Sequence, residues 1–97
     1  MESYDHQAQL AAYRQTIDHL DAALIYILAE RFRSTYKIGE LKATHNLPEV
    51  DKNREELQLA RLKRLAQGTS LEPHFIEGLM RFIIDEVVHR HSQIRAK

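Results

Sequence analysis

The feature of this sequence that most restricts its fold is a long segment without a helix breaker. Between Leu10 and Leu41 the chain contains no proline and a single glycine. Apolar residues recur there at steps of three and four, at Leu10, Tyr13, Ile17, Leu20, Leu24 and Ile27, and resume at Ile38 and Leu41. Such spacing is typical of a helix that packs along its length. We therefore predict one very long helix that begins near Ser3 or Asp5 and ends near Thr44.

Two shorter helices should follow. The segment Asn46-Leu47-Pro48 should end the first helix, because a residue before proline disfavours the α region. The second helix is predicted from about Pro48 or Glu49 to Ala66, with Gly68 as the stop signal just past its end. The third should open within Ser70–Pro73, with the proline in its first turn. The fold class is thus all-α, with three helices per chain.

The length of the first helix bears on the oligomeric state. A helix of ~38 residues is about 57 Å long, whereas a compact domain of this size has a diameter of roughly 32 Å. Half of the apolar seam would therefore face water in a single chain, and exposed apolar surface of that extent usually marks an interface. We predict an intertwined helical homodimer. The alternative is a kinked first helix that folds back in a monomeric bundle.

Composition restricts the location and the partners of the chain. Its 97 residues allow one domain, residues 1–97, in which we expect residues 1–7 to be flexible and residues 94–97 to fray. Fourteen basic residues balance fourteen acidic ones, so no nucleic-acid partner is predicted. Neither a signal peptide nor an apolar run long enough for a membrane is present, which predicts a cytoplasmic protein without membrane contact. The chain has no cysteine, and its six histidines form no convincing metal-ligand set.

Charged residues occupy positions where the apolar seam should continue. The register from Ile27 predicts Arg31 as the next seam residue, and Lys42 follows three turns later, ~16 Å along the helix. A buried cation is unfavourable unless an anion meets it. Asp51, Arg54 and Glu55 follow at i, i+3 and i+4, which predicts a shared face on the second helix.

Two interpretations of these charges remain open. In the first, the five residues form a structural salt-bridge network between helices. In the second, they line a pocket with surplus positive charge for an anionic ligand, to which Arg14 of a second chain would add. On the third helix, Met80, Ile84, Val87 and His91 form one inward row. A lone inward histidine is more often structural than functional.

Several segments resemble the AroQ-type, all-helical chorismate mutases. Arg14–Asp21, Leu28–Arg31 and Lys37–Lys42 are similar to the first helix of that family. Val50–Glu55 resembles the start of its second helix, and Phe75–Asp85 its third. The resemblance implies an all-α dimer that converts chorismate to prephenate without a cofactor, in the biosynthesis of phenylalanine and tyrosine.

The resemblance also implies roles for individual residues. Arg14 from the partner chain and Arg31 would bind the two carboxylates of chorismate. Lys42 would contact a carboxylate and the ether oxygen whose bond breaks. Asp51 and Glu55 would hold the ring hydroxyl, with Glu55 also near Lys42. Arg54 would support the second carboxylate.

Two positions on the third helix depart from the family pattern. Val87 stands where members often have a serine that helps to bind a carboxylate. His91 stands where many have a glutamine that donates to the ether oxygen, and an imidazole can donate there as a neutral tautomer or as imidazolium. The resemblance therefore implies catalytic roles for Lys42, Glu55 and His91, and a weaker contribution from Val87.

Three other functions remain possible at this point. Isochorismate pyruvate lyases share the scaffold and the pattern of two arginines and a lysine, and the segment Phe75–Leu79 is similar to theirs. Asp51 and Glu55 favour the mutase, because the lyase is less acidic at those positions. A non-catalytic helical dimerisation module would use the same charges as structural ion pairs. A DNA-binding helical dimer is disfavoured by the balanced charge.

Overall fold

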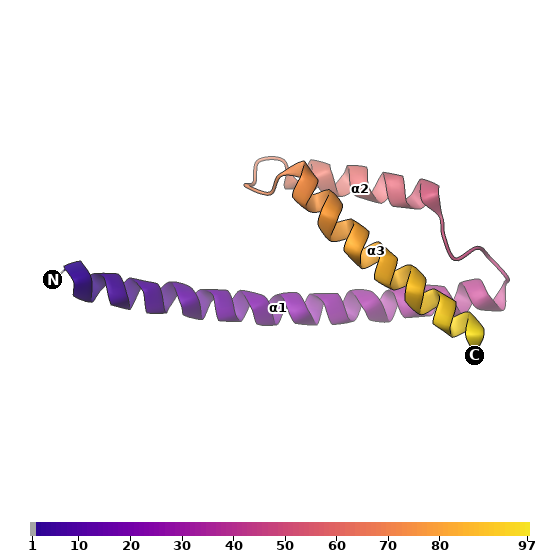
Figure 1. The fold of residues 1–97 in the computed structure, drawn as a ribbon, viewed down its shortest axis with the longest axis horizontal. Helices are drawn as coiled ribbons and strands as arrows, with labels where there is room; N and C mark the ends of the chain where they lie inside the picture. The colour runs from indigo at the N-terminus through magenta and orange to yellow at the C-terminus, as the bar shows by residue number, and fades with distance from the viewer. Residues whose placement is uncertain (1) are drawn as a thin grey trace. The chain divides into compact units, whose positions relative to one another are not determined.

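The computed structural model describes residues 2–97, with side chains from residue 5 onward, and consists of three helices (Figure 1). α1 spans Glu2–Thr44, α2 spans Lys52–Ala66 and α3 spans Pro73–Ala96. No strand occurs within residues 2–97. The predicted all-α class and the very long first helix are confirmed. Flexibility of residues 1–7 and fraying of residues 94–97 stay predictions, and Met1 lies outside the described residues.

The chain divides into two compact units, one ending at Arg33 and the other comprising Ser34–Lys97. The predicted single domain over residues 1–97 therefore stays a prediction. The first unit is helical throughout its described part, and its apolar seam is exposed. Leu20 and Ile27, for example, are 63% and 64% exposed. Nothing in this unit buries the seam predicted from the sequence.

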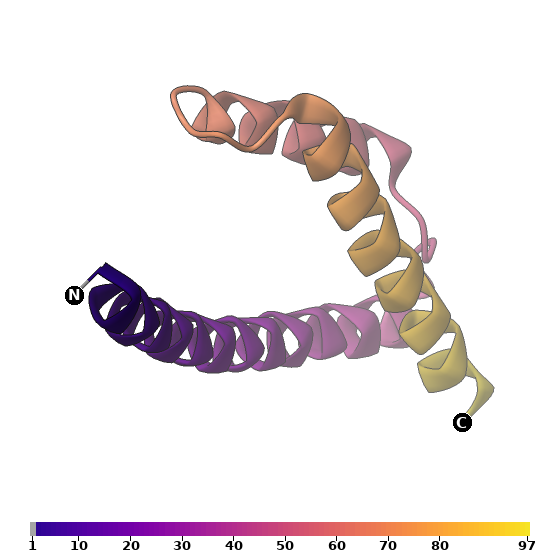
Figure 2. The same cartoon turned by 60° about the vertical axis from the view of Figure 1, so that its left-hand side comes forward.

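The second unit is built on α3. α2 and α3 contact each other and are joined by the short segment 67–72, as both views show (Figures 1 and 2). The buried apolar side chains among residues 5–97 all belong to α3: Ile76, Met80, Ile83 and Ile84. His91 is buried on the same helix, and Val87 is partly buried. The inward row predicted for α3 is thus confirmed.

An ion pair fastens α2 to α3 at the surface. The Nζ of Lys63 on α2 contacts the Oε1 of Glu77 on α3. The hydrogen bond and the positive charge of Lys63 lower the pKa of the Glu77 carboxyl below its ordinary value. The contact therefore depends on Glu77 being ionised.

The end of α1 is fixed by a left-handed residue. Asn46 has a φ of 55°, a conformation that asparagine tolerates better than most residues. The Leu47 N–H donates to the Lys42 carbonyl over 2.7 Å, and the Asn46 N–H donates to the Ala43 carbonyl over 3.3 Å. This pair of bonds is the Schellman motif, which satisfies the last helical carbonyls. The predicted end near Thr44 is confirmed, with Asn46 as the stop in addition to Pro48.

The start of α2 differs from the prediction. The helix begins at Lys52, so the predicted start at Pro48 or Glu49 is wrong. Asp51 is the N-cap residue, with extended backbone, and its Oδ1 accepts the Arg54 N–H over 3.0 Å. An aspartate cap satisfies an otherwise unpaired N–H at the helix end, which determines where the helix begins.

The end of α2 and the start of α3 lie where the sequence predicted them. Gly68 has a φ of 83° just past α2, and Pro73 is the first residue of α3. Within residues 2–97, no helix combines the length and the apolar character that a membrane crossing requires.

Candidate active site

The predicted site residues are divided between the two units. Arg14 and Arg31 lie on α1 in the unit that ends at Arg33, where Arg14 is exposed and Arg31 is partly buried. The other predicted residues belong to the unit Ser34–Lys97: Lys42, Asp51, Arg54, Glu55, Val87 and His91. The second unit thus holds the proposed catalytic groups and the acidic residues.

Hydrogen bonds fix both the side-chain ammonium group and the backbone carbonyl of Lys42. It lies in the last turn of α1 and is partly buried. Its Nζ donates to the backbone carbonyl of Glu49 over 3.4 Å, and its own carbonyl accepts from Leu47 and from Arg95. An ammonium group has three N–H donors. Two of them therefore remain for an anionic ligand.

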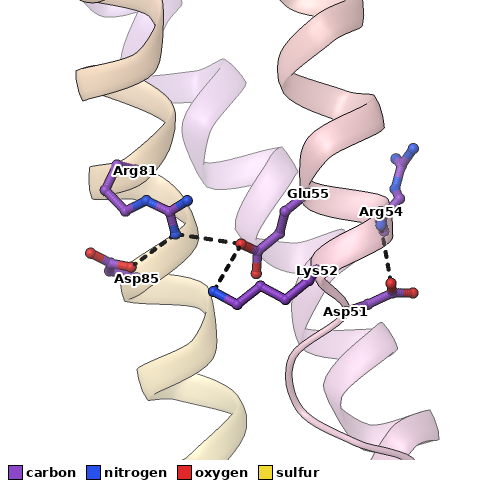
Figure 3. Close-up of polar contacts among 6 residues, drawn as sticks. All are labelled: Asp51, Lys52, Arg54, Glu55, Arg81 and Asp85. Atoms are coloured by element: carbon purple, nitrogen blue, oxygen red, sulfur yellow. Dashed lines mark hydrogen bonds and ion pairs between the residues drawn. The ribbon is translucent and has the colours of Figure 1, made fainter.

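Asp51 and Arg54 are tied together at the start of α2 (Figure 3). The Asp51 carboxylate is turned onto the backbone of its own helix by the capping bond. Both side chains are exposed, and the Arg54 guanidinium stays available to a carboxylate. Local helix capping, rather than a neighbouring helix, therefore orients Asp51.

Glu55 is held between α2 and α3. Its side chain is 12% exposed, and its Oε1 lies 3.4 Å from the Nη1 of Arg81 and 4.0 Å from the Nζ of Lys52. Arg81 in turn lies 3.6 Å from Asp85 (Figure 3). Glu55 thus sits in a short chain of alternating charges.

The predicted common face of Asp51, Arg54 and Glu55 is wrong. Figure 3 shows Glu55 directed toward α3, whereas Asp51 and Arg54 lie on the other side of α2. The reason is that Arg54 and Glu55 are consecutive residues of α2, which a helix directs about 100° apart. Asp51 precedes the helix as its cap and stays beside Arg54.

The structure also bears on the interpretation of these charges as a salt-bridge network. Within the described part of Ser34–Lys97, no ion pair joins Lys42, Asp51, Arg54 and Glu55 to one another. Glu55 pairs with Arg81 and Lys52, and Lys42 bonds to a backbone carbonyl. The structural network predicted as one of two interpretations is therefore not formed among these four residues.

Arg81 was missed by sequence reasoning. The signal was the series Glu77, Arg81 and Asp85, which alternates in charge every four residues along α3. That spacing predicts the pair between Arg81 and Asp85. It does not predict the pair with Glu55, because the two residues lie on different helices.

A pocket of about 210 Å³ lies between α2 and α3. Its charged lining comprises Lys52, Arg81, Glu55, Glu56 and Glu77. Three carboxylates against two cations would repel a dianion. Of the predicted site residues only Glu55 lines this pocket, so we do not assign it to the anionic ligand.

His91 is 4% exposed and is fastened to the last turns of α1. Its Nε2 lies 2.8 Å from the Thr35 carbonyl oxygen. A carbonyl only accepts, so Nε2 carries the proton and donates. Nδ1 is buried without a hydrogen-bond partner among the described residues. The approach is close because Gly39 faces the ring, where a Cβ would lie 2.5 Å from the His91 Cδ2.

Val87 is partly buried on α3, and its side chain has no hydrogen-bonding atom. Among residues 5–97, no three histidine, aspartate or glutamate side chains are placed to hold a metal ion.

Comparison with known proteins identifies a family and several relatives that are similar to this chain in sequence. Residues 13–92 match the family model described as chorismate mutase type II. The T-protein of Enterobacter agglomerans is 34% identical over 79 residues, which cover 81% of this chain and 21% of that protein. The bifunctional chorismate mutase/prephenate dehydratase of Escherichia coli K12 is 35% identical over 79 residues, 81% of this chain and 20% of the relative. The corresponding Buchnera aphidicola (Schizaphis graminum) protein is 32% identical over 88 residues, which cover 91% of this chain and 23% of that protein. The chain thus spans about a fifth of the length of these relatives.

Proposed function

Because this chain belongs to the chorismate mutase type II family, we propose that it converts chorismate to prephenate as a homodimer without a cofactor. The observation that carries the proposal is the family match over residues 13–92, which includes parts of all three helices. The step belongs to the biosynthesis of phenylalanine and tyrosine. We propose the cytoplasm as its compartment, and the lack of cysteine suits a reducing environment.

The chemistry makes modest demands on the protein. The rearrangement is intramolecular: a carbon–oxygen bond breaks while a carbon–carbon bond forms, so no nucleophile or proton transfer is needed. The protein must hold a dianion in its reactive shape and stabilise negative charge that grows on the ether oxygen. Fixed arginines suit the first task, because a guanidinium binds a carboxylate through two parallel hydrogen bonds.

Lys42 is the residue we assign to the second task. Its ammonium group is partly buried, bonds to a backbone carbonyl and keeps two donors for the substrate. A preorganised cation stabilises developing charge more than a solvated one does. In the proposed complex, Arg14 of the partner and Arg31 bind the carboxylates, supported by Arg54.

The acidic residues and the third helix complete the proposed site. Asp51 and Glu55 point to different sides of α2, so we assign the ring hydroxyl to Glu55, which faces α3, and a supporting role to Asp51, the cap bonded to the Arg54 N–H. His91, in its imidazolium form, donates to the ether oxygen from Nδ1 as a second catalytic donor beside Lys42, because Nε2 is bonded to the Thr35 carbonyl. Val87 lines the site without donating, so one carboxylate contact depends on the arginines alone.

The exposed seam supports the homodimer. The first six residues of the α1 seam are each more than two-fifths exposed: Leu10, Tyr13, Ile17, Leu20, Leu24 and Ile27. Full burial of one such side chain contributes about 1.5–3 kcal/mol. A second copy with the same seam would cover these residues, and its α1 would bring Arg14 to the first chain's site.

The experiment follows the loss of the ultraviolet absorbance of chorismate and identifies prephenate by chromatography. Lys42→Ala should lower kcat by about 100-fold or more, as loss of a transition-state donor does. Arg31→Ala should lower kcat/KM strongly. Matched controls are Lys37→Ala and Arg33→Ala, which remove exposed cations from the same helix. Formation of pyruvate from isochorismate, with chorismate unchanged, would instead identify the lyase, and no turnover of either would leave the dimerisation module.

A further inference from the structure

Arg95 joins three segments of the chain at the end of α3. Its Nη2 donates to the carbonyl oxygen of Lys42 over 3.2 Å. Its Nε lies 3.7 Å from the Oε1 of Glu49, which belongs to the linker between α1 and α2. The two side chains of this ion pair are 28% and 29% exposed. One guanidinium therefore contacts both the end of α1 and the linker that follows it.

Both contacts of Arg95 help to fix the position of Lys42. Arg95 holds the backbone of Lys42 directly through the carbonyl. It also holds Glu49 through the ion pair, and the backbone carbonyl of Glu49 accepts the Nζ of Lys42 over 3.4 Å. Lys42 is thus fixed at its backbone carbonyl by Arg95 and at its ammonium end by Glu49, which Arg95 also contacts. The planar guanidinium suits this arrangement, because its donors point in fixed directions.

We propose that Arg95 is a positioning residue for Lys42, acting through the Lys42 carbonyl and through Glu49. The inference rests on the proposed function, in which the Lys42 ammonium meets the ether oxygen. A lysine side chain has large rotamer freedom, and a misplacement of about 1 Å can cost about 100-fold in rate. Arg95 itself does not touch the substrate, and its effect on turnover is transmitted by Lys42.

The test replaces Arg95 in the full chain and separates kcat from KM. Arg95→Met should lower kcat by about tenfold and change KM by less than about twofold, because the Lys42 contact strengthens in the transition state. Arg95→Lys keeps the charge toward Glu49 and should restore most of the turnover. Lys97→Met is the matched control, since it removes an exposed cation just beyond the same end of α3, and it should leave kcat unchanged.

Repeating the Arg95 substitution in a Lys42→Gln variant distinguishes positioning of Lys42 from a general effect on the stability of the protein. In Lys42→Gln, the added change Arg95→Met should have no further effect on kcat, because two changes in one pathway are not additive. An equal loss in both backgrounds would overturn the proposal. So would an unchanged kcat in Arg95→Met while the wild type turns over chorismate, and the proposed function would then stand. If the wild type fails to convert chorismate, it is the proposed function that fails.

If Arg95→Met does not fold, the proposal can be tested at Glu49, the other partner of the ion pair. Glu49→Gln leaves the backbone carbonyl that Lys42 uses and weakens the contact with Arg95, because a neutral hydrogen bond replaces the ion pair. It should reproduce part of the loss in kcat, with circular dichroism showing a folded protein. A normal kcat in folded Glu49→Gln would overturn the role of Glu49 in the proposal.

Discussion

The Nε2 of His91 and the carbonyl oxygen of Thr35 are 2.8 Å apart, which assigns the ring proton to Nε2. The neutral imidazole therefore donates to Thr35 and has only a lone pair at Nδ1. A second donor exists only in the imidazolium form. The sequence allowed His91 to donate to a ligand either as a neutral tautomer or as imidazolium. With Nε2 bonded to Thr35, only the imidazolium has a donor left for a ligand.

The first prediction concerns His91 as a hydrogen-bond donor. If Nδ1 of the imidazolium donates to the ether oxygen, His91→Leu should lower kcat by about 100-fold, because that side chain offers no donor. His91→Gln carries an amide donor and should retain more of the turnover. Steady-state kinetics of the two variants check this, with circular dichroism showing that both fold. Equal kcat in the two folded variants would remove His91 from the donor role.

The second prediction concerns the two glycines of helix interiors. Gly39→Ala would place a Cβ 2.5 Å from the His91 Cδ2 and 2.8 Å from the Ile94 Cδ1. The ring is held by Thr35 and cannot yield freely, so we expect a loss of about 1–2 kcal/mol from overpacking. Gly78→Ala meets nothing within 4 Å and should stabilise α3 by about 1 kcal/mol. Urea unfolding of both variants measures the difference, and equal effects would contradict the close approach.

The third prediction concerns stability in acid. The folded-state pKa of Glu77 lies below its ordinary value of 4.5 because of Lys63. A lowered pKa contributes stability above the unfolded-state value, and that contribution is lost as pH falls through the folded-state value. Wild type should therefore exceed Glu77→Gln in stability at about pH 6 and lose the advantage toward about pH 3. Lys63→Met should lose the same pH-dependent part, and an advantage that persists in acid would contradict the assignment.

The fourth prediction concerns the site shared between two chains. Arg14→Ala and Lys42→Ala should each be nearly inactive alone. In a mixed dimer, one of the two sites receives an intact Lys42 from one chain and an intact Arg14 from the other. Co-refolding equal amounts should therefore restore about a quarter of wild-type activity, given random pairing in a two-fold dimer. No recovery, with mixed dimers present by native mass spectrometry, would place both residues in one chain's site.

Local patterns in the sequence predicted most of the fold. The three-four spacing of apolar residues in a segment without proline predicted α1, and the row ending in His91 predicted the buried face of α3. The predicted start of α2 was wrong because both Glu49 and Asp51 are residues that suit a helix start. Only the capping bond from Arg54 to Asp51 distinguishes them. Asn46 shows the same limit, since its left-handed backbone is a property of the folded turn.

The site was harder to predict wherever contacts join distant segments. Glu55 and Arg81 are 26 positions apart, and Arg95 and Lys42 are 53 apart. No helical spacing relates such pairs, because their approach depends on how the helices pack. Arg95 also lies within residues 94–97, for which fraying stays a prediction, so the sequence did not suggest a defined contact there.

The small core of the single chain has a consequence for how the protein behaves on dilution. Among the described side chains, only four apolar ones are buried, all on α3, whereas the seam of α1 is exposed. A chain of this size has little surplus stability of its own. If association covers the seam, folding and assembly become one equilibrium, and its midpoint depends on protein concentration by mass action. Expression level would then help to determine what fraction of the protein is folded in the cell.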